Sequence, residues 1–141
     1  MNLELQREVL CREAVKAMKG AYAPYSGYCV GAALECADGT VYMGCNIENA
    51  SYTPTVCGER VAIFKAVSEG KRDFTRIAIA GGKGAVIEDI FPPCGVCRQV
   101  MSEFCASDFE ILLIKKEEPL AYEVHTLAEL LPYRFSPDHL K

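Results

Sequence analysis

The chain has 141 residues and a formal net charge of −4, and half of its residues are hydrophobic. This length allows one domain with a substantial core, and the composition excludes a disordered chain. No cluster of Lys and Arg marks a nucleic-acid track, and no apolar run approaches the roughly 20 residues of a membrane span. We therefore expect a single domain over 1–141 that binds neither nucleic acid nor membrane.

The N-terminal segment and the cysteine content predict the compartment. Residues 1–12 alternate charged and apolar side chains, unlike a secretory signal peptide. Eight cysteines in a chain without an export signal indicate reduced thiols rather than a disulfide framework. We expect a cytoplasmic protein.

The first half of the chain predicts a helix, two strands and a second helix. An apolar stripe that includes Leu5, Val9 and Met18 predicts an opening helix that ends at Gly20. Residues 28–36 and 40–46 are typical of strands joined at Asp38-Gly39, a strong hairpin signal. A helical pattern then runs from residue 57 to 70.

The second half alternates strands and helices. We predict a short buried strand at 76–80, a helix at 94–105, a strand at 110–115 and a short edge strand at 122–125. The glycine-rich segment 81–84 lacks the spacing of a phosphate-binding loop, so we interpret it as a strand exit. Thr126, with Glu129 three residues later, predicts a capped short helix at 126–131. This order predicts an α/β fold in which helices flank a mixed sheet.

Three cysteines and one glutamate have spacing that suits a catalytic zinc. Cys57 precedes Glu59 by two residues, and Pro93 precedes Cys94 and Cys97 in a Pro-Cys-x-x-Cys segment. Three protein ligands leave the fourth tetrahedral position of zinc open for water, which then loses its proton near neutral pH. A glutamate beside the first ligand can move protons without binding the metal, and this arrangement resembles the signature of zinc deaminases, with Cys in place of His at the first ligand.

The charges around such a site also matter. Three thiolates outweigh the charge of a divalent cation, and Arg60 is the obvious group to offset the excess. Both cysteine segments begin predicted helices, whose N-terminal N–H groups favour anions. A Cys-x-x-Cys pair is also typical of redox pairs and of structural zinc half-sites. A closed four-cysteine site would need a second cysteine pair, which the chain lacks.

Across nearly its full length, the chain resembles the short, homotetrameric cytidine deaminases. The resemblance lies in segments 22–26, 30–34, 44–52, 57–60, 93–99 and 130–132, together with Phe135. It implies a three-layer α/β/α sandwich with a mixed five-stranded sheet. It also implies one zinc per chain, a homotetramer with shared active sites, and hydrolytic deamination of cytidine and deoxycytidine in pyrimidine salvage.

The resemblance also implies residue roles. Cys57, Cys94 and Cys97 would bind zinc, Glu59 would be the catalytic acid and base, and Arg60 and Gln99 would hold the cysteines. The implied nucleoside-binding residues are Tyr28, Asn46, Glu48, Ala50, Tyr52, Gly58 and Phe135. Asn46 and Glu48 would bind ribose hydroxyls, the backbone N–H of Gly58 would face the pyrimidine carbonyl, and Tyr52 and Phe135 would act across interfaces.

The chain departs from the family pattern at three of the positions considered. Tyr28 stands where Phe is usual, Gly58 replaces Ala, and Thr53 stands where Gly is frequent.

Three rival interpretations remain. A blasticidin-type deaminase has the same three-cysteine zinc and size, but the Asn46-x-Glu48 segment favours an ordinary nucleoside. An RNA or DNA deaminase is disfavoured by the acidic charge. A non-catalytic zinc-binding module is the alternative from a different class, and incubation with cytidine would distinguish it.

Overall fold

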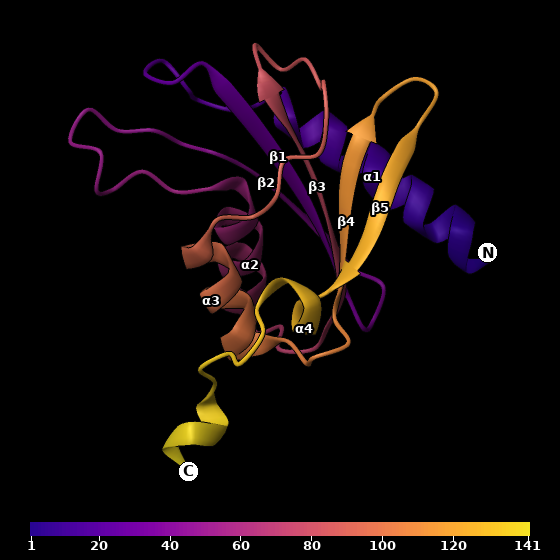
Figure 1. The fold of residues 1–141 in the computed structure, drawn as a ribbon, viewed down its shortest axis with the longest axis vertical. Coiled ribbons are helices and arrows are strands. Elements are labelled where there is room, and N and C mark those ends of the chain that lie inside the picture. The colour runs from indigo at the N-terminus through magenta and orange to yellow at the C-terminus, as the bar shows by residue number, and fades with distance from the viewer.

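A computed structural model describes all residues, 1–141, and shows a five-stranded sheet with helices on both faces (Figure 1). The elements in chain order are α1 (Leu3–Met18), β1 (Tyr28–Cys36), β2 (Val41–Cys45), α2 (Gly58–Ser68), β3 (Phe74–Lys83), α3 (Gly95–Phe104), β4 (Glu110–Lys116), β5 (Ala121–Thr126), α4 (Leu127–Leu130) and a 3₁₀ helix, Pro137–Leu140. The sheet order is β2-β1-β3-β4-β5. Only β3 and β4 are parallel, which makes the sheet mixed.

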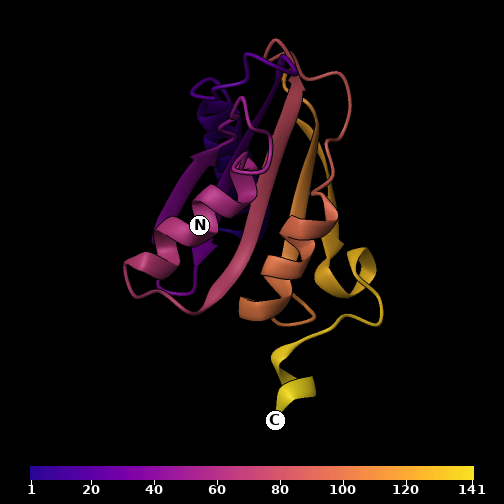
Figure 2. The ribbon, with the colours of Figure 1, turned by 90° about the vertical axis from the view of Figure 1, so that its left-hand side faces the viewer.

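The helices form two layers with the sheet between them. Helix α1 covers one face, and α2 and α3 lie side by side on the other, as Figures 1 and 2 show. Each face has its own buried cluster: Leu10 and Met18 of α1 belong to one, and Ile63 of α2 and Met101 of α3 belong to the other. The three-layer α/β/α sandwich implied by the resemblance is confirmed.

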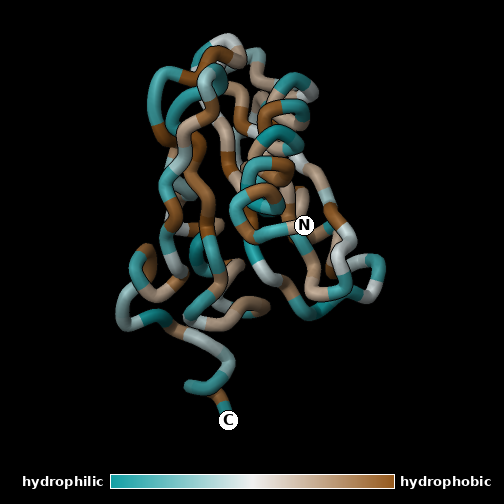
Figure 3. The backbone as a smooth tube through the Cα atoms, turned by 90° about the vertical axis from the view of Figure 1, so that its right-hand side faces the viewer, coloured by the Kyte–Doolittle hydropathy of each residue, from teal (hydrophilic) through white to brown (hydrophobic).

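Local sequence signals set the starts of α1 and α4. Asn2 caps α1 by accepting a hydrogen bond from the Leu5 N–H at 2.8 Å. The capping box predicted at Thr126 and Glu129 is present at α4. Helix α1 presents an apolar stripe to the sheet, and Figure 3 shows hydrophilic and hydrophobic residues alternating along it.

No helix of the structure is both long enough and apolar enough to cross a membrane.

The segment 81–84 corrects one prediction. Strand β3 continues through Lys83, so the predicted end at residue 80 is wrong by three residues. Gly81 and Gly82 pair with Val30 and Cys29 of β1, and this backbone pairing extends the strand beyond its apolar run.

Close backbone contact at Gly44 positions α2 on the sheet. A Cβ at Gly44 would lie 2.4 Å from the carbonyl oxygen of Gly58 and 2.5 Å from the Ala62 nitrogen. Any side chain there would push the start of α2 away from β2. The start of this helix carries Cys57 and Glu59, so the fit at Gly44 bears directly on the candidate site.

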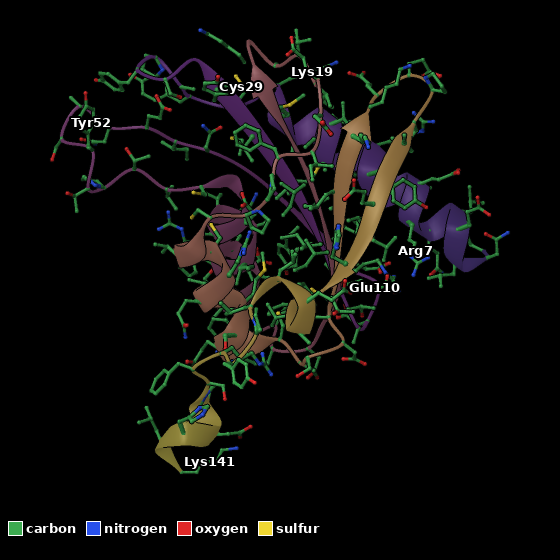
Figure 4. All side chains as sticks on the ribbon, viewed as in Figure 1. Arg7, Lys19, Cys29, Tyr52, Glu110 and Lys141 are labelled. Atoms are coloured by element: carbon green, nitrogen blue, oxygen red, sulfur yellow. The ribbon has the colours of Figure 1, made fainter.

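An ion-pair network joins helix α1 to strands β1, β3 and β4 of the sheet. Arg76 of β3 pairs with Glu35 of β1 and, at 3.0 Å, with Glu110 of β4. Arg7 of α1 also reaches Glu110, with a separation of 2.6 Å, and Figure 4 shows these two side chains together. The network lies away from the candidate site.

Candidate active site

The two cysteine segments, far apart in sequence, meet where α2 and α3 begin. Cys57 is the N-cap of α2, and Cys94 is the N-cap of α3. Their Sγ atoms lie 3.7 Å apart, and the Sγ atoms of Cys94 and Cys97 lie 3.6 Å apart. All three sulfurs lie within 4.8 Å of one another.

This spacing fits a tetrahedral zinc. With zinc–sulfur bonds of about 2.3 Å, two sulfurs on one tetrahedral ion lie about 3.8 Å apart. Neither Cys57 nor Cys94 uses its side chain to cap its helix, so these sulfurs remain available to a metal. Three thiol ligands suit zinc, and they leave one coordination position for a non-protein group.

Hydrogen bonds favour a thiolate in this cluster. Contact with Cys97 and with the Arg60 guanidinium lowers the pKa of Cys57 to about 5. Arg60 Nη2 donates to the Cys57 Sγ across 3.4 Å. The same contact between Cys57 and Cys97 raises the pKa of Cys97. These contacts thus favour a thiolate at Cys57, and the Arg60 guanidinium partly offsets its negative charge.

Glu59 is a buried carboxylate beside the sulfur cluster. Its relative exposure is 3%, and its Oε1 atom has no hydrogen-bond partner in the protein. Burial, together with the nearby Cys57, raises the pKa of Glu59 to about 7. A buried carboxylate with an unpartnered oxygen is costly to stability, so its presence points to a chemical role.

A cavity of about 200 Å³ opens above Glu59 and the cysteines. Strand β1, the segment after β2, and the segment before α3 supply its walls. The lining residues are Ser26, Tyr28, Val30, Asn46, Glu48, Thr55, Val56, Cys57, Glu59, Phe91, Pro92 and Cys94. The structure therefore brings together Tyr28, Asn46, Glu48, Glu59 and two of the predicted ligands, Cys57 and Cys94.

Asn46 is held rigidly at the cavity wall. Its Oδ1 accepts from the Val30 N–H at 2.8 Å, and its Nδ2 donates to the Tyr28 carbonyl oxygen, also at 2.8 Å. The amide still has a second N–H and a second acceptor position for a ligand.

Glu48 is held by the segment that precedes β1. Its Oε1 accepts from the N–H groups of Tyr25 and Ser26 at 2.9 and 3.1 Å, and its Oε2 accepts from the Ser26 hydroxyl. These hydrogen bonds lower the pKa of Glu48, so it is an anion at neutral pH. A carboxylate has about four acceptor positions, which leaves room for a hydroxyl donor.

Four other residues that the sequence predicted for the site do not line this cavity in the single chain. Ala50 is exposed in the 46–57 loop, and Tyr52 is 72% exposed at the tip of that loop (Figure 4). Phe135 is 56% exposed on the C-terminal segment, where its ring stacks on His139. Gln99 donates to the Phe135 carbonyl oxygen at 2.9 Å rather than to a cysteine.

Gly58 has a place beside the cavity. It is buried at the first position of α2, where an added Cβ would lie 3.1 Å from the Val30 carbonyl oxygen.

Ser26 and Phe91 are among the cavity residues that were not predicted from the sequence. Ser26 links Glu48 to β1, since its Oγ donates to Glu48 and accepts from the Tyr28 N–H at 3.0 Å. Phe91 lines the cavity next to Tyr28, and the ring centroids lie 5.9 Å apart. The only sequence signal for Phe91 is an aromatic residue close to the Pro-Cys segment.

Comparisons with known proteins show which family the chain resembles. A family model described as the cytidine and deoxycytidylate deaminase zinc-binding region matches residues 5–113. The chain is 45% identical to a cytidine deaminase of Halalkalibacterium halodurans over 136 residues, which cover 96% of the chain and 98% of that protein. It is 47% identical to a cytidine deaminase of Sporosarcina psychrophila over 94% of the chain and 93% of that protein.

Solved structures show the same likeness. A crystal structure of cytidine deaminase from Burkholderia pseudomallei superposes with a TM-score of 0.83 at 39% identity, covering 96% of the chain and 100% of the other. One of cytidine deaminase from Mycobacterium tuberculosis gives a TM-score of 0.76 at 36% identity, covering 92% and 96%.

Proposed function

Because the chain belongs to the cytidine deaminase family, we propose that it hydrolyses cytidine and deoxycytidine to uridine and deoxyuridine, with release of ammonia. The observation that carries this proposal is the buried carboxylate of Glu59, whose Oε1 has no hydrogen-bond partner, beside three cysteine sulfurs and lining a cavity of about 200 Å³. A role in pyrimidine salvage would follow from these products.

The cofactor of this family is zinc, and we propose that Cys57, Cys94 and Cys97 hold one ion per chain. When bound, zinc supplies Lewis acidity that lets water lose a proton near neutral pH. Two of the three sulfur pairs already have the separation expected for ligands of one zinc ion, which supports this assignment. Arg60 limits the net negative charge of the cluster through its contact with Cys57.

Glu59 would move the protons of the reaction. Attack of water at C4 of the pyrimidine requires a group that accepts the water proton. The ring nitrogen N3 must also gain a proton. The amine at C4 then needs a proton to leave as ammonia. A carboxyl group whose pKa lies near 7 can accept and return a proton at each of these points.

Asn46 and Glu48 would bind the sugar. Each keeps a free hydrogen-bonding position after its contacts with the protein. Cytidine and deoxycytidine both carry 3′ and 5′ hydroxyls, so these groups can bind either sugar. The anionic Glu48 would repel the phosphate of a nucleotide, which favours nucleosides as substrates.

We also propose that the enzyme is a homotetramer in the cytoplasm. The large exposure of Tyr52 and Phe135 in the single chain leaves both rings available to a neighbouring subunit, which supports shared sites. Eight unpaired cysteines suit a reducing compartment. A solution mass near four times the chain mass of 15.5 kDa is the expected result in light scattering.

The assay is direct. Purified, zinc-loaded protein should convert cytidine to uridine, followed by ultraviolet absorbance, and deoxycytidine is tested in parallel. Blasticidin S in the same assay distinguishes an enzyme for nucleoside analogues. Cys94→Ala should lose most of its zinc and its activity. A folded wild-type protein that holds zinc but deaminates neither nucleoside would refute the proposal.

A further inference from the structure

The segment that leads into α3 has no backbone hydrogen bonds of its own. Residues 87–93 lie between β3 and α3 and belong to no helix or strand. None of their N–H or carbonyl groups takes part in a backbone–backbone hydrogen bond. The Ile90 N–H donates to the side chain of Asp89, which ties the segment only to itself. Yet the residue that follows this segment is Cys94, a proposed zinc ligand.

Arg98 supplies the only hydrogen bond between this segment and another element. Its Nε donates to the Pro93 carbonyl oxygen at 2.9 Å, and its Nη1 donates to the Leu130 carbonyl oxygen at 2.8 Å. Leu130 is the last residue of α4, which lies beside α3 in Figures 1 and 2. Carbonyl groups at a helix end have no partner within the helix, so Leu130 is a ready acceptor. One guanidinium therefore bridges the residue before Cys94 to α4.

Both anchors of this bridge are fixed by packing. The Pro93 side chain is fully buried. Helix α4 is held by its capping box and by Leu127, which is buried in the same hydrophobic core as α3. The N–H groups of a guanidinium form a rigid planar fork, so two hydrogen bonds also fix its orientation. The position of the Pro93 carbonyl in turn determines where α3 begins, and with it where Cys94 lies.

The side chain of Cys94 has little other support. It is exposed, it caps no helix N–H, and its Sγ has polar contacts only with the sulfurs of Cys57 and Cys97. Gln99, which the resemblance implies would hold the cysteines, donates to the Phe135 carbonyl oxygen instead. The bridge made by its neighbour in α3 is thus the nearest polar support of this ligand.

On the basis of the proposed zinc site, we propose that Arg98 is a positioning residue that keeps Cys94 within reach of an ion held by Cys57 and Cys97. Without the bridge, residues 87–93 have no hydrogen bond to the rest of the protein, and Cys94 moves with them. Zinc then binds more weakly, because its binding must also order the segment. Arg98 acts through the backbone at Pro93, not through contact with the metal.

The test measures the zinc affinity of the full chain by competition with a chromogenic chelator. Replacing a residue that orients a metal ligand typically changes metal affinity by about 10–100-fold, so Arg98→Ala should weaken zinc binding by a factor in that range. Arg98→Lys keeps the charge but lacks the planar fork, and its affinity should lie closer to that of Arg98→Ala than to that of wild type.

Arg134→Ala is the matched control for the loss of a guanidinium. Arg134 donates to the Cys105 carbonyl oxygen at 2.9 Å, at the opposite end of α3 from the sulfurs. Its replacement removes a comparable hydrogen bond, and zinc affinity should equal that of wild type. Wild-type affinity in Arg98→Ala, equal losses in Arg98→Ala and Arg134→Ala, or full recovery in Arg98→Lys would overturn the inference.

Proteolysis of the metal-free protein provides a readout that does not depend on zinc. A glutamate-specific protease cuts after Glu88, within the segment 87–93. Mass spectrometry should show this cleavage several times faster in Arg98→Ala than in wild type, and unchanged in Arg134→Ala. Arg98→Lys, the milder change, should also be cut faster, and it serves alone if Arg98→Ala does not fold.

Unchanged cleavage after Glu88 in the folded Arg98 variants would contradict the inference. A wild-type chain that binds no zinc contradicts the proposed function instead, and the cleavage rate still decides whether Arg98 holds the segment.

Discussion

Replacement of Glu59 by Gln separates a catalytic carboxylate from a structural one. The amide keeps the size and hydrogen-bonding capacity of the side chain but cannot exchange protons between pH 4 and 9. If Glu59 moves the protons of the reaction, kcat for cytidine should fall by about 10²–10⁴-fold in Glu59→Gln. A first-turn carboxylate that served only the helix dipole would contribute about 0.3–1 kcal/mol to stability, and its loss would leave kcat nearly unchanged.

The buried environment of Glu59 also predicts a pH-dependent stability difference. Burial raises the pKa of Glu59 from 4.5 to about 7 in the folded chain. Between these pH values the folded state keeps a proton that the unfolded state has released, so the free energy of unfolding decreases as pH rises. The gap corresponds to about 3 kcal/mol, at roughly 1.4 kcal/mol for each pH unit. Above pH 7 this destabilisation is complete, and below pH 4.5 it is absent.

The Gln variant lacks this titration. In metal-free protein, where no cation alters the electrostatics, the free energy of unfolding of Glu59→Gln relative to wild type should increase by about 2–3 kcal/mol from pH 5 to pH 8. Urea unfolding at both pH values measures it. Glu103→Gln, on the exposed face of α3, is the control and should show no such change. A stability difference that does not vary with pH, together with near-normal deamination, would refute the assignment of Glu59.

Three further variants test the supports of the site and the sheet. Ser26→Ala removes a hydrogen bond to the Glu48 carboxylate, so KM for cytidine should rise several-fold to about tenfold while zinc content stays constant. Gly44→Ala should destabilise the protein by about 1–3 kcal/mol and lower kcat, because the added Cβ displaces α2; a denaturation midpoint equal to wild type would contradict this. Glu110→Gln should cost about 1.5–3 kcal/mol, since it removes the carboxylate that pairs with Arg7 and one of the two carboxylates that pair with Arg76. Pairing with Arg7 and Arg76 lowers the pKa of Glu110 in the folded state, so its contribution to the stability of wild type is lost as the pH falls through that lowered pKa. The stability difference between Glu110→Gln and wild type should therefore disappear in acid.

Much of the fold and of the metal site could be predicted from local patterns. Hairpin residues, caps and apolar periodicity depend on interactions within a few residues, so the order of elements and the capping box at Thr126 are confirmed. The three cysteines and Glu59 could be selected as candidate site residues, because their residue types and spacing indicate metal and proton chemistry without any knowledge of the fold.

Contacts between distant segments depended on the tertiary structure. The sequence alone gives no distance between Cys57 and Cys94, which the start points of α2 and α3 place 3.7 Å apart. Nor does it show that Phe91 reaches the cavity wall. That contact exists because β3 continues through Gly81, where the missing side chain lets the ring rest on the backbone. Residue types and short-range spacing thus determined the chemistry and the elements of this protein, whereas sheet register and close approach at glycines decided which side chains share a cavity. The physical reason is that local backbone preferences act over a few residues, while the separation of distant side chains is decided only when whole elements pack.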